Sequence, residues 1–176
     1  MGIEEDLERF CERAVELGAT SAKAIRAEDV VTAEWVRLKC QYGCDGYAQR
    51  LTCPPYSPTP AKTRRVLDCY TWAILLHFET VDSSDSQWPN THEIIAKLER
   101  EVFLSDYYSA FGFGSGPCYE CRRCNLEECT HADVARPSME AAGIDVYATA
   151  RRAGYDLHVV TDESQCPTFH SLLLVR

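Results

Sequence analysis

The stretch Trp72-Ala-Ile-Leu-Leu-His-Phe-Glu-Thr-Val81 contains the most apolar run in the chain, and it predicts a buried β-strand. The polar residues 82–85 that follow it indicate a surface loop. Residues 157–161 and 169–175, near the C-terminus, are also apolar and predict two closing strands. The expected sheet is therefore assembled from strands that lie far apart in the sequence.

Helices are predicted before and after this strand. Residues 4–17 place apolar side chains at three- and four-residue spacing, which is typical of an amphipathic helix. Asn90 and Glu93 are spaced like a capping box at the start of a second long helix. The other predicted elements are helices at 60–69, 137–143 and 145–152 and extended segments at 22–27 and 31–38.

Helices and strands mix without a strict repeat, so the sequence predicts an α+β or α/β fold. Its length of 176 residues suits one domain with its own hydrophobic core. We therefore expect a single domain over residues 1–176, with a mixed sheet, flanking helices and two cysteine-rich metal-binding loops at 40–53 and 118–129.

Composition excludes several classes of function. The net charge of −9 argues against nucleic-acid binding, which needs basic patches to neutralise phosphates. No stretch approaches the roughly 20 apolar residues of a membrane span. The first residues include Glu4, Glu5 and Asp6, unlike a signal peptide. We expect a cytoplasmic protein, and the sequence indicates no particular oligomeric state.

The second cysteine segment, Gly114-Ser-Gly-Pro-Cys118-Tyr-Glu-Cys121-Arg-Arg-Cys124-Asn-Leu-Glu-Glu-Cys129, carries the strongest functional signal. Three cysteines at two-residue intervals form a tight loop whose sulfurs project toward one point. Each iron of a cubane cluster takes one thiolate, and the Cys-x2-Cys-x2-Cys run of bacterial ferredoxins supplies three in succession. This segment therefore predicts a 4Fe–4S cluster.

The match to the ferredoxin run has limits. Four residues separate Cys124 from Cys129, where the ferredoxin run has three, and Thr130 and His131 follow in place of proline. Cys129 therefore either completes this cluster or reaches to another. Zinc is the main alternative, with His131 as a further possible ligand, although zinc usually takes two separated cysteine pairs.

The first cysteine segment contains Cys40, Cys44 and Cys53 at less diagnostic spacing, and it predicts a second metal site. Two cubanes bound only by cysteine need eight thiolates, and the two segments supply seven. Either Cys69 or another group completes the set, or one iron lacks a protein thiolate. Such an open iron can act as a Lewis acid on a substrate.

Other residues carry weaker signals. Cys11 fits a packing role, Cys69 fits packing better than ligation, and Cys166 is not expected to be a ligand. Glu140 follows the second segment and is positioned to donate a proton, although a capping or surface role is favoured. The sequence contains no Walker loop, no dinucleotide-binding fingerprint and no nucleophile elbow.

Three stretches resemble the DUF2284 family of predicted metal-binding proteins, namely residues 36–55, 116–129 and 135–146. The resemblance implies metal binding by the cysteines of both segments, and the family's association with anaerobic bacteria and archaea would suit oxygen-sensitive clusters. His131 stands where a proline is often present in the family. The implied ligands are Cys40, Cys44, Cys53, Cys118, Cys121, Cys124 and Cys129.

Three functions are consistent with these patterns. The first is electron transfer by one or two 4Fe–4S clusters to a redox protein partner. The second is a cluster-dependent enzyme that uses an open iron for sulfur or small-molecule chemistry. The third is a zinc-stabilised structural or interaction module. The resemblance favours a metal without naming a reaction.

Overall fold

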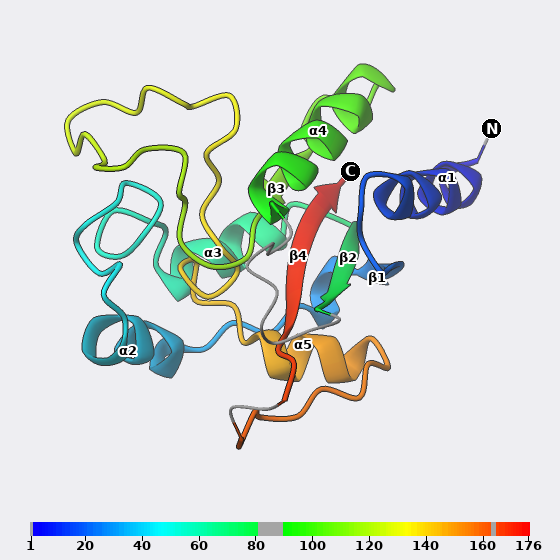
Figure 1. The fold of residues 1–176 in the computed structure, drawn as a ribbon. Coiled ribbons are helices and arrows are strands. Elements are labelled where there is room, and N and C mark those ends of the chain that lie inside the picture. Colours follow the sequence, from blue (N-terminus) through cyan, green and yellow to red (C-terminus); the bar gives the residue numbers. More distant parts are fainter. Residues whose placement is uncertain (1, 81–89, 163–164) are drawn as a thin grey trace.

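The computed structural model describes residues 2–80, 90–162 and 165–176. These residues form a four-stranded sheet in the order β1-β2-β4-β3, flanked by helices (Figure 1). The strands are β1 (Ser21–Arg26), β2 (Trp72–Glu79), β3 (Phe111–Phe113) and β4 (Thr168–Val175). The expected α+β class is therefore confirmed.

Every neighbouring pair in this sheet is antiparallel, so the predicted mixed sheet is wrong. The reason lies in the position of β4. Strands β2 and β3 both run antiparallel to β4, and hence parallel to each other, but β4 lies between them. The C-terminal strand thus separates the two strands whose direct pairing would have been parallel.

Side chains of β2 alternate between two cores, as expected for a strand that is buried on both faces. Ile74, Leu76 and Phe78 pack in the core that includes residues of α1 (Ile3–Glu16) and α4 (Thr91–Leu104). Ala73 and Leu75 pack on the opposite face, with residues of α3, α5 and the turn at 138–144. The bounds of these last two helices are Pro60–Leu67 and Val146–Arg152.

Four of the predicted helices are present, at α1, α3, α4 and α5. The predicted cap at Asn90 is confirmed, since its side chain accepts a hydrogen bond from the Glu93 amide. The helix α2 (Glu34–Gly43), however, replaces the extended segment predicted at 31–38. The alternation of apolar residues suggested a strand with one buried face. Trp35 and Leu38 are instead 49% and 55% exposed, and only Val36 of this helix is buried.

Two further predictions are wrong. Residues 137–143 form turns in place of a helix, because backbone pairing with Gly114 holds this segment beside the sheet. Residues 157–161 form no strand, and Val159 is 63% exposed. A short 3-10 helix, η1 (Ala27–Asp29), follows β1. The loop predicted at 82–85 lies outside the described residues.

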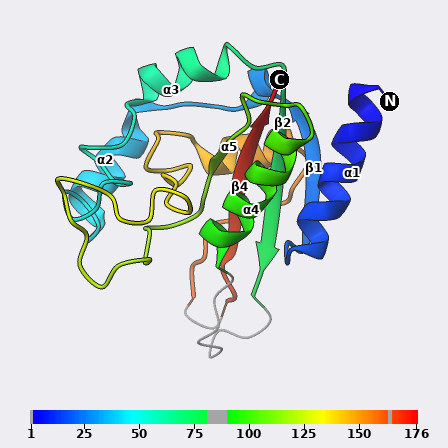
Figure 2. The ribbon, with the colours of Figure 1, turned by 90° about the horizontal axis from the view of Figure 1, so that it is seen from above.

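None of the helices among the described residues has the length and apolar character needed to cross a membrane. Seen from the perpendicular direction, α1 and α4 lie at one side of the sheet (Figure 2). The segments that follow α2 and β3 project together at the other end of the molecule in both views (Figures 1 and 2). The sheet therefore keeps the two cysteine segments away from α1.

Gly143 closes the turn at 138–144 in a conformation that favours glycine. Its φ is +78°, and a Cβ added there would lie 2.9 Å from Cα of Pro60, the first residue of α3. Side chains avoid this backbone region, and the contacted atom belongs to a fixed backbone. Glycine at this position therefore permits the close packing of the turn against α3.

Replacing Gly143 by alanine should lower the free energy of unfolding by about 3 kcal/mol, from backbone strain and the forced contact with Pro60. The thermal midpoint of anaerobically prepared protein, followed by circular dichroism, should fall by roughly 6 to 12 °C. Gly2→Ala is the control, because no heavy atom lies within 4 Å of its added Cβ. Equal midpoints for the two variants would contradict this account.

His170 in β4 is 2% exposed, and neither of its ring nitrogens has a hydrogen-bond partner among the described residues. Its ring lies 4.9 Å from that of His77, the cross-strand neighbour on β2. Burial, and then the proximity of His77, lowers the pKa of His170 to about 4 from an ordinary 6.5. The His170 ring is therefore neutral at physiological pH.

The unfolded chain binds a proton at His170 below pH 6.5, whereas the folded chain resists it until about pH 4. Stability should therefore fall as the pH drops through this window, by up to about 3 kcal/mol. His170→Phe should flatten the decline of the thermal midpoint between pH 7 and pH 5. His158→Gln, at an exposed site, should keep it, and a wild-type decline in both variants would refute this role.

Candidate metal centre

The cysteines of the first segment surround one cavity, although they come from different local structures. Cys40 lies in the last turn of α2, whereas Cys44 and Cys53 lie in the loop that follows this helix. All three line the same cavity of about 810 Å³. A Cβ on Gly46 would lie 3.5 Å from the sulfurs of both Cys44 and Cys53, so glycine permits a close approach of the backbone.

Helix α2 is held in place by Arg37, one turn before Cys40. Its Nη1 donates hydrogen bonds to Ser57 Oγ at 3.1 Å and to the carbonyls of Pro58 and Ala141 at 3.1 and 3.3 Å. One guanidinium thus connects the helix, the end of the first cysteine loop and the turn at 138–144. The Cys40 sulfur lies 4.0 Å from the carbonyl oxygen of Glu140 in this turn.

The loop that carries the second segment leaves the sheet after β3 and returns beside the point where it began. The Gly114 amide donates to the Pro137 carbonyl at 2.9 Å, and the Met139 amide donates to the Gly114 carbonyl at 3.1 Å. These bonds join the two ends of the loop, so the segment that carries the cysteines is anchored at its base.

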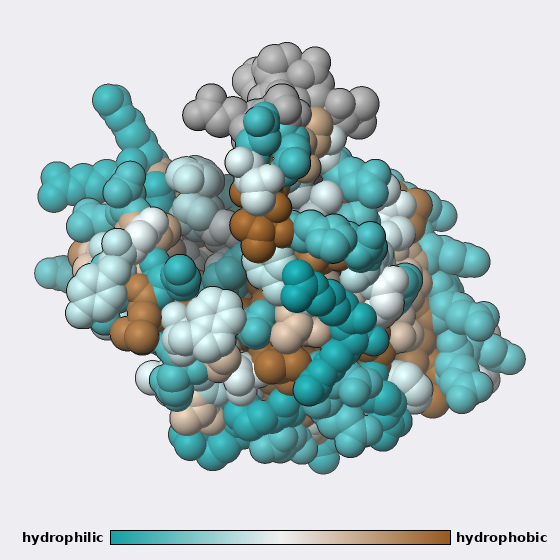
Figure 3. Space-filling view, turned by 90° about the horizontal axis from the view of Figure 1, so that it is seen from below, coloured by the Kyte–Doolittle hydropathy of each residue, from teal (hydrophilic) through white to brown (hydrophobic). Residues whose placement is uncertain are grey.

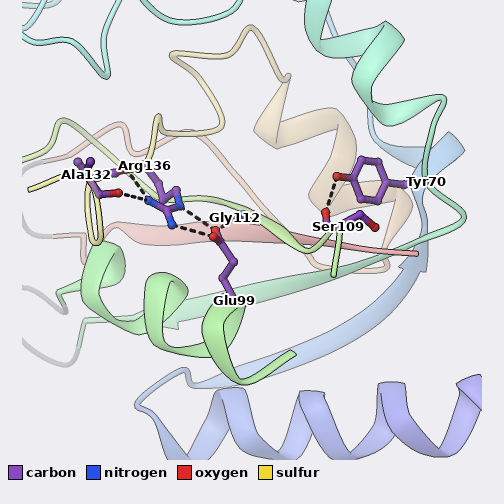
Figure 4. A network of polar contacts seen from close by, with 7 residues as sticks. Tyr70, Glu99, Ser109, Gly112, Ala132 and Arg136 are labelled. Atoms are coloured by element: carbon purple, nitrogen blue, oxygen red, sulfur yellow. Dashed lines mark hydrogen bonds and ion pairs between the residues drawn. The ribbon is translucent and has the colours of Figure 1, made fainter. Parts of the chain in front are cut away.

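An ion pair reinforces the base of this loop (Figure 4). Arg136 donates two hydrogen bonds to the Glu99 carboxylate of α4, each 2.7 Å long. The Gly112 amide of β3 donates to the same carboxylate at 2.7 Å. The two charged side chains are only about 15% exposed, so this paired geometry avoids leaving either charge desolvated and unpartnered.

The cysteines of the second segment also share a cavity. A second, smaller cavity is lined by four thiols, together with Arg50, Thr52 and His131, and these thiols belong to Cys118, Cys121, Cys124 and Cys129. The Cys121 sulfur lies 3.7 Å from the Thr130 hydroxyl, and the Cys124 sulfur donates to the Asn125 carbonyl at 3.7 Å. The predicted ligands thus form two groups, and Cys129 lies with its own segment.

The two groups are neighbours. A Cβ on Gly46 would lie 3.7 Å from Cβ of Pro117, which immediately precedes Cys118. Pro117 also lines the cavity of the first group. The thiols of Cys53 and Cys118 are close enough for each other's charge to matter, since a Cys118 thiolate raises the pKa of Cys53. The first and second sites therefore meet at Pro117 and Cys118.

Burial governs the protonation of these thiols. It raises the pKa of Cys40 to about 11, and it also raises the pKa values of Cys53 and Cys118. These thiols are therefore uncharged without a metal, and metal binding must displace their protons. Arg37 opposes the rise in the pKa of Cys40, and Arg50 does so for Cys53 and Cys118.

Arg50 was missed as a site residue by sequence reasoning. Its guanidinium lies 4.8 Å from the Tyr119 ring centre and acts on thiols of both groups. A positive charge at the junction of two anionic sites favours the metal-bound thiolates on both sides. The available signal was its place within the first segment, three residues before Cys53.

The remaining cysteines line neither thiol cavity. Cys69 is exposed just beyond the end of α3, and its sulfur donates to the Arg65 carbonyl at 3.4 Å. Cys11 lies in α1 and packs against the core, whereas Cys166 is exposed. Cys69 therefore does not complete the first group, which leaves that group with three thiols.

The cavity beside the first group extends toward the sheet and α5. Seen from below, patches of apolar side chains lie between hydrophilic ones on this face (Figure 3). The polar groups that line the cavity differ in charge; they include Lys39, Glu140, Asp145, Arg151 and His170. A cavity of this size and mixed lining suits a small organic ligand.

Glu140 has an unusual environment within this cavity. Its Oε2 atom is inaccessible to solvent and has no hydrogen-bond partner in the part of the chain that the structure describes. Burial raises the pKa of its carboxyl group, because a charged carboxylate is poorly solvated there. The surface or capping role favoured by the sequence is therefore wrong, and Glu140 belongs to the wall of the first site.

Comparison with known proteins identifies a family without naming a reaction. Residues 23–175 match the DUF2284 model, whose description is "predicted metal-binding protein". No curated protein and no solved structure matches the chain. The match spans both thiol groups and the sheet that supports them, and the chain belongs to the DUF2284 family of predicted metal-binding proteins.

Proposed function

We propose that this protein binds two 4Fe–4S clusters, one at each thiol group, and transfers electrons to a redox protein partner in the cytoplasm. The observation that carries this proposal is the grouping of the seven cysteines into two adjacent sets. Cys118, Cys121, Cys124 and Cys129 would hold one cluster. Cys40, Cys44 and Cys53 would hold three irons of the other.

The arrangement of the thiols supports a cluster over zinc. In the described residues, no three His, Cys, Asp or Glu side chains converge closely enough to hold a single metal ion. Zinc needs its four ligands around one point. A cubane binds each thiolate at a different iron, so its ligands lie around a larger inorganic core. Thiols that share a cavity without converging on one point fit the second arrangement.

The contact between the two sites supports electron transfer. Pro117 and Cys118 join the second loop to the first cavity, so two clusters there would lie close together. The second loop is largely exposed, and a partner protein could approach its cluster from solvent. In this proposal, electrons pass from the first site, which lies deeper beside the cavity, to the second and from there to the partner.

Iron and acid-labile sulfide in anaerobically prepared protein test this proposal. Wild type should contain about eight of each per chain. Cys121→Ala with Cys124→Ala should remove about half of both, and Cys44→Ala with Cys53→Ala should remove the other half. Cys69→Ala with Cys166→Ala is the control and should keep the full content. Zinc without sulfide, or wild-type content in both test variants, would refute the proposal.

The cavity favours a second candidate function, a cluster-dependent enzyme. Three thiolates leave one corner of a cubane without cysteine, and the three thiols line a cavity of about 810 Å³. A bound cluster with such a corner supplies a Lewis-acidic iron. The residues of the chain would bind the substrate, since apolar side chains line part of the cavity and the neutral His170 ring can form a hydrogen bond.

Cyanide is a suitable probe for such a corner. Adding it to the reduced protein should change the paramagnetic resonance signal of one cluster, because small anions bind iron that lacks a thiolate. The Cys44→Ala, Cys53→Ala variant should lose the responding signal, and the Cys121→Ala, Cys124→Ala variant should keep it. Wild-type signals that stay unchanged at saturating cyanide would leave electron transfer as the function.

A further inference from the structure

Glu140 lies at the first site, the group that has only three thiols. It lines the same cavity as Cys40, Cys44 and Cys53, and its Oε2 is buried without a hydrogen-bond partner. Burying an ionisable oxygen without a partner is costly, and proteins usually satisfy such groups with a hydrogen bond, a counter-charge or a metal. Among the described residues, the chain supplies no hydrogen-bond partner for this oxygen.

The neighbouring cation does not supply this partner. Arg37 lies close enough to influence Cys40, but its Nη1 donates to Ser57, Pro58 and Ala141. No ion pair to Glu140 is present in the described part of the chain. Ser138 assists the carboxyl group, yet Oε2 remains unsatisfied. An iron at this site would provide the partner that Oε2 lacks.

The backbone around Glu140 is fixed, so its side chain is held at the cavity wall. Met139 and Ala141 on either side are buried. The Ser57 hydroxyl donates to the Ala141 carbonyl, and the Thr63 hydroxyl donates to the Ala142 carbonyl, each at 2.6 Å. A residue in so constrained a turn is presented in one direction, as a ligand must be.

The number of thiols points the same way. A cubane has four irons, the first site contributes three cysteines, and Cys69 lies outside the cavity. Carboxylate oxygen is an ordinary iron ligand in proteins. The Cys40 sulfur is 4.0 Å from the Glu140 carbonyl oxygen, which places the two residues on the same wall of the site.

We propose that the Glu140 carboxylate is the fourth protein ligand of the first cluster and binds the iron that no cysteine reaches. This inference rests on the proposed function, because it requires a cluster at the first site. An oxygen ligand is harder and less tightly held by a cluster iron than a thiolate. Glu140 therefore protects this iron at rest and yields its position to a ligand that enters from the cavity.

Mössbauer spectroscopy of protein reconstituted with 57Fe tests the assignment directly. In wild type, one iron per chain should differ from the all-thiolate irons, because it has an oxygen ligand. Glu140→Ala and Glu140→Gln should change the parameters of that iron. Glu140→Cys should make it resemble the others and should abolish the response to cyanide. Glu128→Gln, an exposed acid beside Cys129, is the matched control and should preserve the wild-type spectrum.

The outcomes separate this inference from the proposed function. Wild-type spectra in Glu140→Ala and Glu140→Gln, with both clusters present, would overturn the ligand assignment and leave the two-cluster proposal intact. Loss of the first cluster from Glu140→Ala and its retention in Glu140→Cys would support the assignment. Wild-type protein without iron or sulfide would refute the proposed function itself.

Discussion

Backbone contacts at one turn, residues 138–144, hold the two thiol groups in a fixed relation to each other and to the sheet. The turn pairs with Gly114 at the base of the second loop, and the Gly143 carbonyl accepts the amide of Ala33 at the start of α2. It also receives hydrogen bonds from Ser57 and Thr63, which lie after the first cysteine loop. Without these contacts, each cysteine segment would be a separate surface loop.

The electrostatics of the two sites follow from this packing. Bringing thiols from both segments under partial burial raises their pKa values, so the apo sites favour neutral sulfur. Arg37 and Arg50 oppose that effect without forming a basic surface. An acidic protein can thus accommodate anionic thiolates, because the compensating charges lie beside the sulfurs and metal ions add their own.

Local patterns predicted much of this molecule. The apolar run at 72–79, the cap at Asn90 and the helix that follows Asp145 depend on neighbouring residues, and each is present. The grouping of the cysteines by segment followed from spacing, except for Cys129, which the sequence left open between two sites. The extended prediction at 31–38 failed because residues such as Trp35 alternate without being buried in a sheet. The environment of Glu140 could not be predicted, since it depends on contacts with residues about 80 positions away.

The location of β4 affects how the protein is made. This strand pairs with both β2 and β3, yet it follows both cysteine segments in the chain. During synthesis, the thiols leave the ribosome while β2 and β3 still lack the strand between them. The thiols are therefore available to a metal on a chain whose sheet is still open, and pairing of the final strand then closes the sheet.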